Sequence, residues 1–375
     1  MQGGEPRCVP DASRMVAVTG GCQHRSVAWA EQLAVAVPQR SPVFVNVGAN
    51  KGYNAAAFMA LWSLLSVTES GWHRHVVRFA NDRNESELLA TRPCGECNPH
   101  CIFCEGRKCC RHVRGERGGC LANPMRHLHP RRVPGATAHM LELQASNREL
   151  LRYVVNATGA AGHMLVHDVG ASNESRVVVI KTRAAGAENG ALSSLSTGGG
   201  RTTETVQILP LDVFFEAQGI RNVYHVSVDT EGYDPLVLRG MHETLQQRRV
   251  TLLEFEYSGK GHWASGTEHT LERTLQWLGG MGYFCYWQAP RDLIPASSPC
   301  WLPSFERRKW SNLVCTHDAT VHKVLQAIVT TGSSRRQSEC SGNARKRGRA
   351  KDGNWCGRGG RTGRGAARRV NFAHG

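Results

Sequence analysis

The sequence contains no run of about 18 apolar residues, the length that a membrane-spanning helix needs. The N-terminal stretch MQGGEPRCVPDASRM also lacks the charged and then apolar segments of a secretory signal peptide. These two absences predict a chain without a membrane span and favour a soluble intracellular protein. A chain that lacked an upstream segment would look the same, so the compartment stays open.

Acidic residues are too few to balance the basic ones, and the net charge is +15. The excess is local: residues 331–375 carry a net charge of +10 and residues 71–138 carry +6, which leaves −1 for the rest. Such segments can contact nucleic acid or acidic surfaces. The Gly/Arg-rich tail from Thr331 is expected to be disordered. Its only aromatic residues are Trp355 and Phe372, so base stacking by the tail is not favoured.

Between residues 43 and 290, short apolar runs typical of strands alternate with helical patterns. This alternation predicts an α/β fold with a mostly parallel sheet. We expect an N-terminal extension over residues 1–40, a main domain over 41–330 and a disordered tail over 331–375. A Cys-, Arg- and His-rich insertion over residues 71–138 would interrupt the main domain, because the composition changes sharply at Gly71.

The stretch VFVNVGANKGY, residues 43–53, joins an apolar strand to a helical segment through a glycine turn. Gly48 permits a tight turn out of the strand, and Gly52 lets the helix pack closely and leaves room for a ligand. Asn50 tolerates left-handed backbone better than most residues do. The pattern indicates a ligand across a helix N-terminus. An ordinary strand-to-helix turn is the alternative.

Glu142 follows the next predicted strand, where an acid in nucleotide-binding sheets bonds the ribose hydroxyls. The usual distance from the glycine turn is about 20 residues, whereas Glu142 lies 90 residues after Gly52. Without the proposed insertion over residues 71–138, the distance from Gly52 to Glu142 would be close to the usual one. A solvated acid at a helix start is the alternative.

The stretch VSVDTEGYDPLVLRG places Asp229 and Glu231 at the carboxyl end of another apolar strand, with Gly232 opening the turn. Ligands bind at this end of parallel strands. Two acids there can orient a hydroxyl, accept its proton or hold a metal. The alternative is that Asp229 only caps the following helix.

Seven of the fourteen cysteines lie between Cys94 and Cys120. Two pairs have the Cys-x₂-Cys spacing, which suits a zinc site, although only three residues separate the pairs. Disulfides are an equal alternative in an oxidising compartment, and free thiols are a third. The metal or disulfide candidates are Cys94, Cys97, Cys101 and Cys104.

Five blocks together resemble the FkbM-type S-adenosylmethionine-dependent methyltransferases. They are VFVNVGANKGY, HMLELQASNRELL, HDVGASNESR with GALSSLSTG, LDVFFEAQGIRNVYHVSVDTEGYDPLVLRGMHETL, and TLLEFEYS. The resemblance covers about residues 43–290. It implies a class I methyltransferase fold, Rossmann-like, with a mostly parallel sheet covered by helices on both faces.

The resemblance also implies the cofactor S-adenosylmethionine and transfer of its methyl group, usually to an oxygen. Asp229 and Glu231 would then be catalytic. The residues assigned to the cofactor site are Asn46, Gly48, Asn50, Gly52, Tyr53, Glu142 and Asp168. Two positions depart from the family pattern: Asn46 stands where most members have Asp, and Ser227 lies in the stretch where members carry a Lys.

The leading hypothesis is therefore an O-methyltransferase that acts on a hydroxyl of a small molecule or glycan. If the cysteines of the insertion bind a metal and do not form disulfides, zinc is a further cofactor. The alternative is a nucleic-acid-binding protein or RNA methyltransferase that uses the basic tail and the cysteine-rich insertion. The sequence does not identify the acceptor or the oligomeric state.

Overall fold

The computed structural model describes Cys8 and residues 28–84, 132–186, 203–265, 268–288, 293–308 and 311–329. All of them belong to one compact unit, Met1–Gly332. The expected tail and most of the expected insertion, with Cys94, Cys97, Cys101 and Cys104, lie outside the described residues. No helix in the described ranges combines the length and hydropathy that a bilayer crossing needs.

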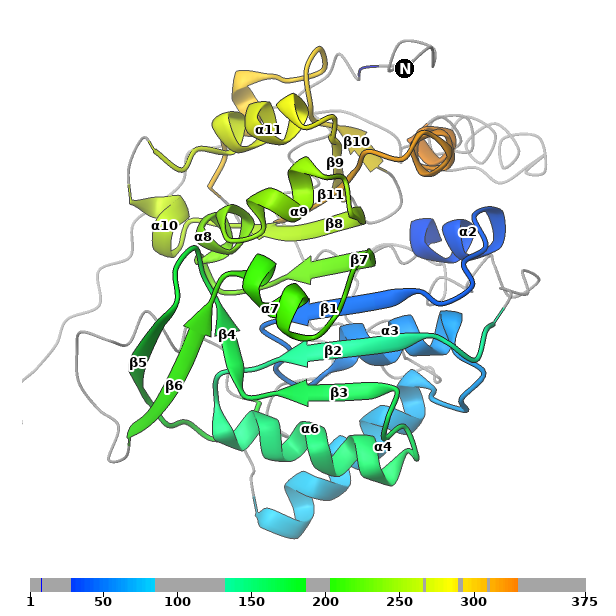
Figure 1. Ribbon diagram of the computed structural model, residues 1–375, viewed down its shortest axis with the longest axis vertical. Helices are drawn as coiled ribbons and strands as arrows, with labels where there is room; N and C mark the ends of the chain where they lie inside the picture. The colour runs from blue at the N-terminus through cyan, green and yellow to red at the C-terminus, as the bar shows by residue number, and fades with distance from the viewer. Residues whose placement is uncertain are drawn as a thin grey trace, which may run out of the picture. The chain divides into compact units, whose positions relative to one another are not determined.

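The centre of the unit is an eight-stranded sheet with the order β10-β9-β11-β8-β7-β1-β2-β3 (Figure 1). Strands β1, β2, β3, β7 and β8 pair in parallel, and β11 runs antiparallel between β8 and β9. The strands are β1 (Val43–Val47), β2 (Thr137–Leu141), β3 (Met164–His167), β7 (Val223–Val228), β8 (Val250–Tyr257), β9 (Phe284–Gln288), β10 (Leu293–Pro295) and β11 (Ser311–Thr316). The expected α/β fold with a mostly parallel sheet is confirmed.

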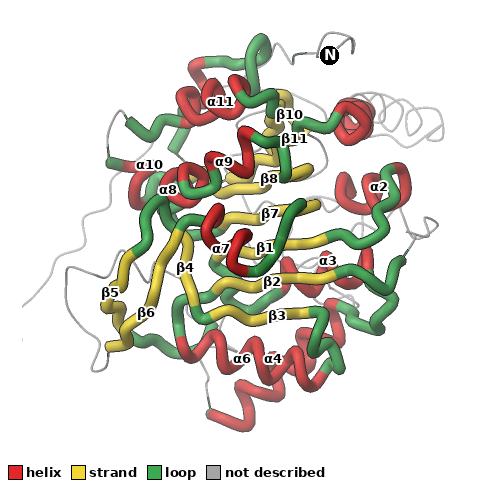
Figure 2. Tube along the Cα trace, in the orientation of Figure 1, coloured by secondary structure: helices red, strands yellow, loops and turns green. Residues whose placement is uncertain are grey.

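Helices cover both faces of this sheet, and Figure 2 shows them in red around the yellow strands. One apolar cluster includes side chains of α2 (Ala28–Ala36), α3 (Tyr53–Trp62), α4 (Glu69–Arg83), α6 (Ala145–Ala157) and helical residues 319–329. A second cluster on the other face includes side chains of α7 (Leu211–Ala217), α8 (Asp234–Arg239), α9 (His242–Gln246), α10 (Gly261–Ala264), α11 (Leu271–Gly280) and the 3₁₀ turn η4 (Pro303–Phe305).

A small second sheet stands beside the central one, with the order β4-β6-β5 (Figure 1). Its strands are β4 (Val169–Ala171), β5 (Arg176–Lys181) and β6 (Thr203–Leu209). The alternation of strands and helices had suggested that the run now seen as β5 belongs to the parallel sheet. In β5, however, Val178 and Ile180 are buried while Val177 and Val179 are exposed. Only one face is covered, as is common in antiparallel pairing and unusual in a central parallel strand.

The composition change at Gly71 does not mark the end of regular structure, because α4 runs across it. Trp72 is fully buried in this helix, and its indole Nε1 donates to the backbone oxygen of Lys51 at 2.7 Å. Residues 71–83 are therefore part of the folded domain, so the expected insertion would begin after them. The same holds at the N-terminus: α2 lies in the expected extension, yet its Leu33 is fully buried.

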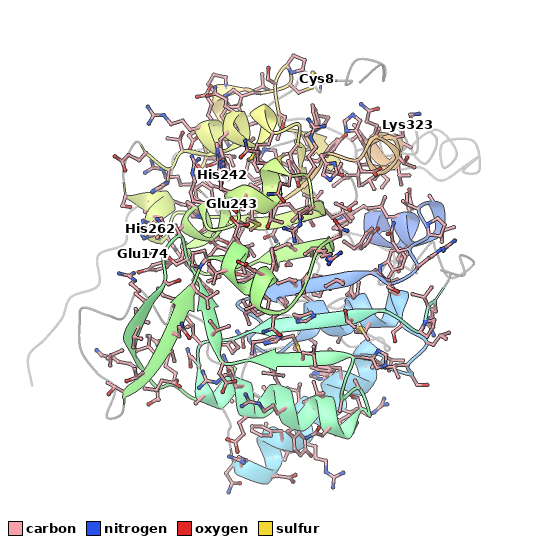
Figure 3. All side chains as sticks on the ribbon, viewed as in Figure 1. Cys8, Glu174, His242, Glu243, His262 and Lys323 are labelled. Atoms are coloured by element: carbon pink, nitrogen blue, oxygen red, sulfur yellow. A yellow bond between two sulfur atoms is a disulfide. The ribbon has the colours of Figure 1, made fainter. Side chains whose placement is uncertain are left out.

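Two disulfides join described cysteines. Cys285 and Cys315 face each other on β9 and β11, and Cys8, labelled at the top of Figure 3, is bonded to Cys300. Disulfides form and persist in oxidising compartments. They therefore favour such a compartment over the intracellular one that the N-terminal stretch had suggested.

The burial of Trp72 gives a test of the revised domain boundary. We expect Trp72→Ala to lower the free energy of unfolding by about 3–5 kcal/mol, because it leaves a large cavity and an unpaired Lys51 carbonyl. Urea denaturation followed by circular dichroism measures this loss. Leu64 is 62% exposed, so Leu64→Ala should change the value by no more than about 0.5 kcal/mol. A similarly small change for Trp72→Ala would place α4 outside the domain.

Candidate active site

The glycine turn lies where the connections of the parallel sheet reverse direction, between β1 and β7. The Gly48 φ of +75° is left-handed, and a Cβ there would stand 2.0 Å from the Asp229 carbonyl oxygen. The Asp229 N–H donates to the Val47 oxygen at 3.0 Å, and the Gly48 and Ala49 N–H groups donate to the Leu141 oxygen. The ends of β1, β2 and β7 thus meet at this turn, in the crevice where such sheets bind ligands.

Gly52 completes the turn at the N-terminus of α3. Its φ is also +75°, and a Cβ there would lie 2.7 Å from both Leu151 and Trp72 side-chain atoms. The expected close packing at Gly52 is therefore present. The neighbours are protein side chains, so Gly52 shapes the turn by admitting α4 and α6.

Glu142 lies directly after β2 and is 6% exposed. One of its oxygens accepts from the Asn50 N–H at 2.7 Å and the other from the Gln144 N–H at 2.9 Å. Burial raises the pKa of this carboxyl, and the two backbone hydrogen bonds act in the opposite direction. The structure thus brings Glu142 to the glycine turn, and it excludes the solvated acid considered as the alternative.

Three amide side chains around this turn carry buried polar atoms without a hydrogen-bond partner in the described ranges. They are both amide atoms of Asn46, Oδ1 of Asn50 and Oε1 of Gln144. Leaving such atoms unpaired costs about 1–3 kcal/mol each. Each carboxylate oxygen of Glu142 also keeps accepting capacity beyond one hydrogen bond. The turn therefore offers several donors and acceptors to a polar ligand.

Of the acids that follow β7, Asp229 and Asp234 have different roles in the turn. The carboxylate of Asp234, which is fully buried, accepts from the Gly232 N–H at 3.1 Å and from the Thr230 N–H at 3.4 Å. Burial, and then the charge of Asp229, raises the Asp234 pKa to about 7. Because Asp234 satisfies these N–H groups, Asp229 is not needed as the cap that the sequence left open.

Glu256 is a further site residue that the sequence analysis did not single out. Val228 of β7 pairs with Phe255 of β8, so Asp229 and Glu256 follow at the same level on neighbouring strands. Their side chains are hydrogen-bonded, and the pKa of Glu256, which is 2% exposed, is raised by burial and then by Asp229. The sequence did contain a signal for Glu256. It is an acidic residue within the apolar run TLLEFEYS, and a buried acid in a central strand needs a partner.

Glu231 lies in the same turn, and its side chain contacts a lysine. Its backbone is left-handed, with φ +55°, and its carboxylate forms an ion pair with Lys260. Of the two acids predicted to act together, the structure therefore pairs Asp229 with Glu256 and Glu231 with Lys260.

Tyr53 and Asp168 were assigned to the cofactor site, and both have protein partners. Tyr53 is buried in the first turn of α3, and its hydroxyl lies 2.9 Å from Nδ1 of His73. Asp168 is exposed after β3 and forms ion pairs with Arg148 and Arg152 of α6. Their roles in binding stay predictions.

The expected metal site is not represented in this part of the chain. No group of three or more His, Cys, Asp or Glu in the described ranges could hold a metal ion. The four cysteines proposed for zinc or disulfides lie outside those ranges, so that hypothesis stays a prediction.

Comparison with protein families shows to which family the chain belongs. The methyltransferase FkbM domain family matches residues 46–285, which include the glycine turn, Glu142, Asp229 and Glu256. The chain belongs to this family. The resemblance inferred from the five sequence blocks is thereby confirmed, and the methyltransferase assignment rests on the FkbM domain.

A solved structure of the METTL16 methyltransferase domain is also similar, with 9% identity and a TM-score of 0.30. The match covers 78% of this chain and 66% of that one, and a likeness of this degree adds nothing to the assignment. No curated protein matches the sequence.

The environment of Asp234 predicts the direction of a pH effect. The folded state holds the Asp234 proton up to about pH 7, whereas an unfolded aspartate releases it near pH 4. The folded state therefore binds more protons between these values, so the stability contribution of Asp234 falls as pH rises through this window and is constant above it. We expect Asp234→Asn to remove this decline.

Urea denaturation of both proteins from pH 4 to pH 8 measures the effect. The free energy of unfolding of the wild type relative to Asp234→Asn should decrease with pH up to about pH 7. A relative stability that rises over this window would contradict the buried, protonated carboxyl.

Proposed function

We propose that this FkbM-family chain is an S-adenosylmethionine-dependent methyltransferase that methylates a hydroxyl of a small molecule or glycan. The observation that carries the proposal is one juxtaposition. The Gly48 turn, with Glu142 and the unpaired amides, meets the Asp229–Glu256 pair at the reversal point of the sheet. A candidate ligand-binding turn and a candidate proton acceptor thus lie side by side at the ends of β1 and β7.

The residues at the turn fit adenosylmethionine. Glu142 would accept from the ribose hydroxyls, and the amides of Asn46, Asn50 and Gln144 would bond its polar groups, which accounts for their unpaired atoms. When bound, the cofactor supplies an electrophilic methyl group on a sulfonium. The chain holds the acceptor in line with that group and excludes water from the crevice.

A hydroxyl acceptor loses its proton during transfer, so a base must lie at the crevice. Asp229 is the better candidate, because Glu256 is the more deeply buried partner and burial raises the pKa of its carboxyl. In the protonated form that burial favours, Glu256 donates a hydrogen bond that orients the Asp229 side chain. Asp229 would then accept the acceptor proton.

Removing the carboxylate of Glu142 should weaken cofactor binding. We expect Glu142→Ala to reduce the binding free energy of S-adenosylmethionine by about 1–3 kcal/mol, the value of a hydrogen bond to a charged group. Isothermal titration calorimetry measures the change. Glu243 is an exposed acid of α9, labelled in Figure 3, and Glu243→Ala is the matched control that should bind like the wild type. Equal affinity of all three proteins would refute the role of Glu142.

Replacing the proposed base should affect transfer rather than binding. We expect Asp229→Asn to lower turnover by roughly two to four decades, which is the usual contribution of a general base, with little change in cofactor affinity. A screen of hydroxyl-bearing small molecules and glycans with radiolabelled cofactor identifies the acceptor for this assay. Glu243→Gln is the carboxylate-to-amide control. Normal turnover in Asp229→Asn with a lower melting temperature would make Asp229 a structural residue.

A further inference from the structure

A cleft lies between α2 and α3 on one face of the sheet, away from the glycine turn. Its cavity volume is about 70 Å³. Its walls are largely aromatic, and we call it the aromatic cleft. The rings are those of Trp29, Phe44, Phe58, Trp62 and Tyr224.

The position of the aromatic cleft separates it from the methyl-transfer crevice. Phe44 precedes Gly48 by four residues and Tyr224 precedes Asp229 by five. At about 3.3 Å per strand residue, these rings lie roughly 13–16 Å from the catalytic ends of β1 and β7. In Figure 1 the arrowheads of these strands point away from α2. Asn54, two residues after Gly52, lines the end of the cleft nearest the turn, whereas a molecule of one ring among these aromatic side chains does not reach the crevice.

The charged group in the cleft already has partners. Oε1 of Glu254 accepts from Nε2 of Gln288 at 2.9 Å, and Oε2 lies 3.3 Å from Nε2 of His225. The indole Nε1 of Trp29 donates to Gln288 at 3.4 Å. Because the Gln288 amide and the His225 ring already lie against the two oxygens of Glu254, an uncharged ligand suits the cleft best.

The Tyr224 hydroxyl differs from these groups. Tyr224 is 6% exposed, and its hydroxyl oxygen is buried with no hydrogen-bond partner among the residues that the structure describes. Its ring makes an edge contact with Trp62, with centroids 4.9 Å apart, and Phe44 stacks on Phe58 at the same distance. Buried tyrosine hydroxyls usually find a partner, so this one identifies the place of a polar ligand atom.

We propose that the aromatic cleft binds a small, uncharged aromatic molecule whose single polar atom forms a hydrogen bond with the Tyr224 hydroxyl. The ring of this molecule packs among the aromatic walls, where offset and edge contacts are favourable. The site is separate from the proposed methyl-transfer crevice and does not depend on the methyltransferase assignment.

Phenol and benzene are matched probes, because they differ by the polar atom alone. Saturation-transfer NMR on the full chain, with and without S-adenosylmethionine, measures their binding. We expect both to bind, with phenol about five- to tenfold tighter, as one hydrogen bond allows. Tyr224→Phe should remove this preference and preserve benzene binding, and the cofactor should compete with neither probe.

Filling the cleft tests its location. Ala57 lines it from α3, and Ala57→Trp should abolish binding of both probes, while Ala217→Trp on the exposed end of α7 should bind them normally. If Ala57→Trp does not fold, the Tyr224→Phe comparison still decides. The proposal is overturned if the wild type binds neither probe, if phenol keeps its preference in Tyr224→Phe, if Ala57→Trp still binds, or if the cofactor displaces the probes.

Discussion

The close approach of the Gly48 turn to the Asp229 carbonyl is the constraint on which the rest of the site depends. A Cβ at position 48 would stand 2.0 Å from that oxygen, so only glycine allows the end of β1 to lie against the end of β7. This contact brings a turn with buried, unpaired amide atoms beside a strand end with acids. Without it, the binding and proton-accepting groups would belong to separate loops.

Burying the acids at the ends of these strands is electrostatically unfavourable, and hydrogen bonds from nearby groups offset part of this cost. Asp234 is bonded to two backbone N–H groups, and Glu256 shares a hydrogen bond with Asp229. Burial raises the pKa values of Asp234 and Glu256, so these two carboxyls hold protons that an exposed acid would release. The pairing places Asp229 at the ends of β7 and β8, where the proposed general base would accept a proton.

Much of the fold could be predicted from local patterns. The strand-turn-helix unit at Val43–Trp62 and the acid after β2 have local signals, namely apolar β-branched runs, glycines and helix formers. The insertion boundary could not be predicted, since α4 mixes Trp72, Val76 and Phe79 with many Arg and His residues. The average composition of α4 is polar, so it does not reveal that these three apolar residues lie on one buried side of the helix.

The partner of Asp229 was harder to predict, because it depends on strand register. Glu256 lies 27 residues further along the chain than Asp229, and only the parallel pairing of β7 with β8 brings them together. The two disulfides and the second sheet depend on pairing in the same way. Spacing along the sequence does not encode these contacts.

The most direct test of the site is the response of individual backbone amides to S-adenosylmethionine. In ¹⁵N-labelled full-length protein, the N–H groups of Asn50 and Gln144, which donate to Glu142, report on the turn. The account predicts that saturating cofactor shifts these two resonances and those of Gly48 and Gly52, and leaves Gly219, in the loop after α7, unchanged. Cofactor binding that leaves the turn unshifted, or no binding at all, would contradict it.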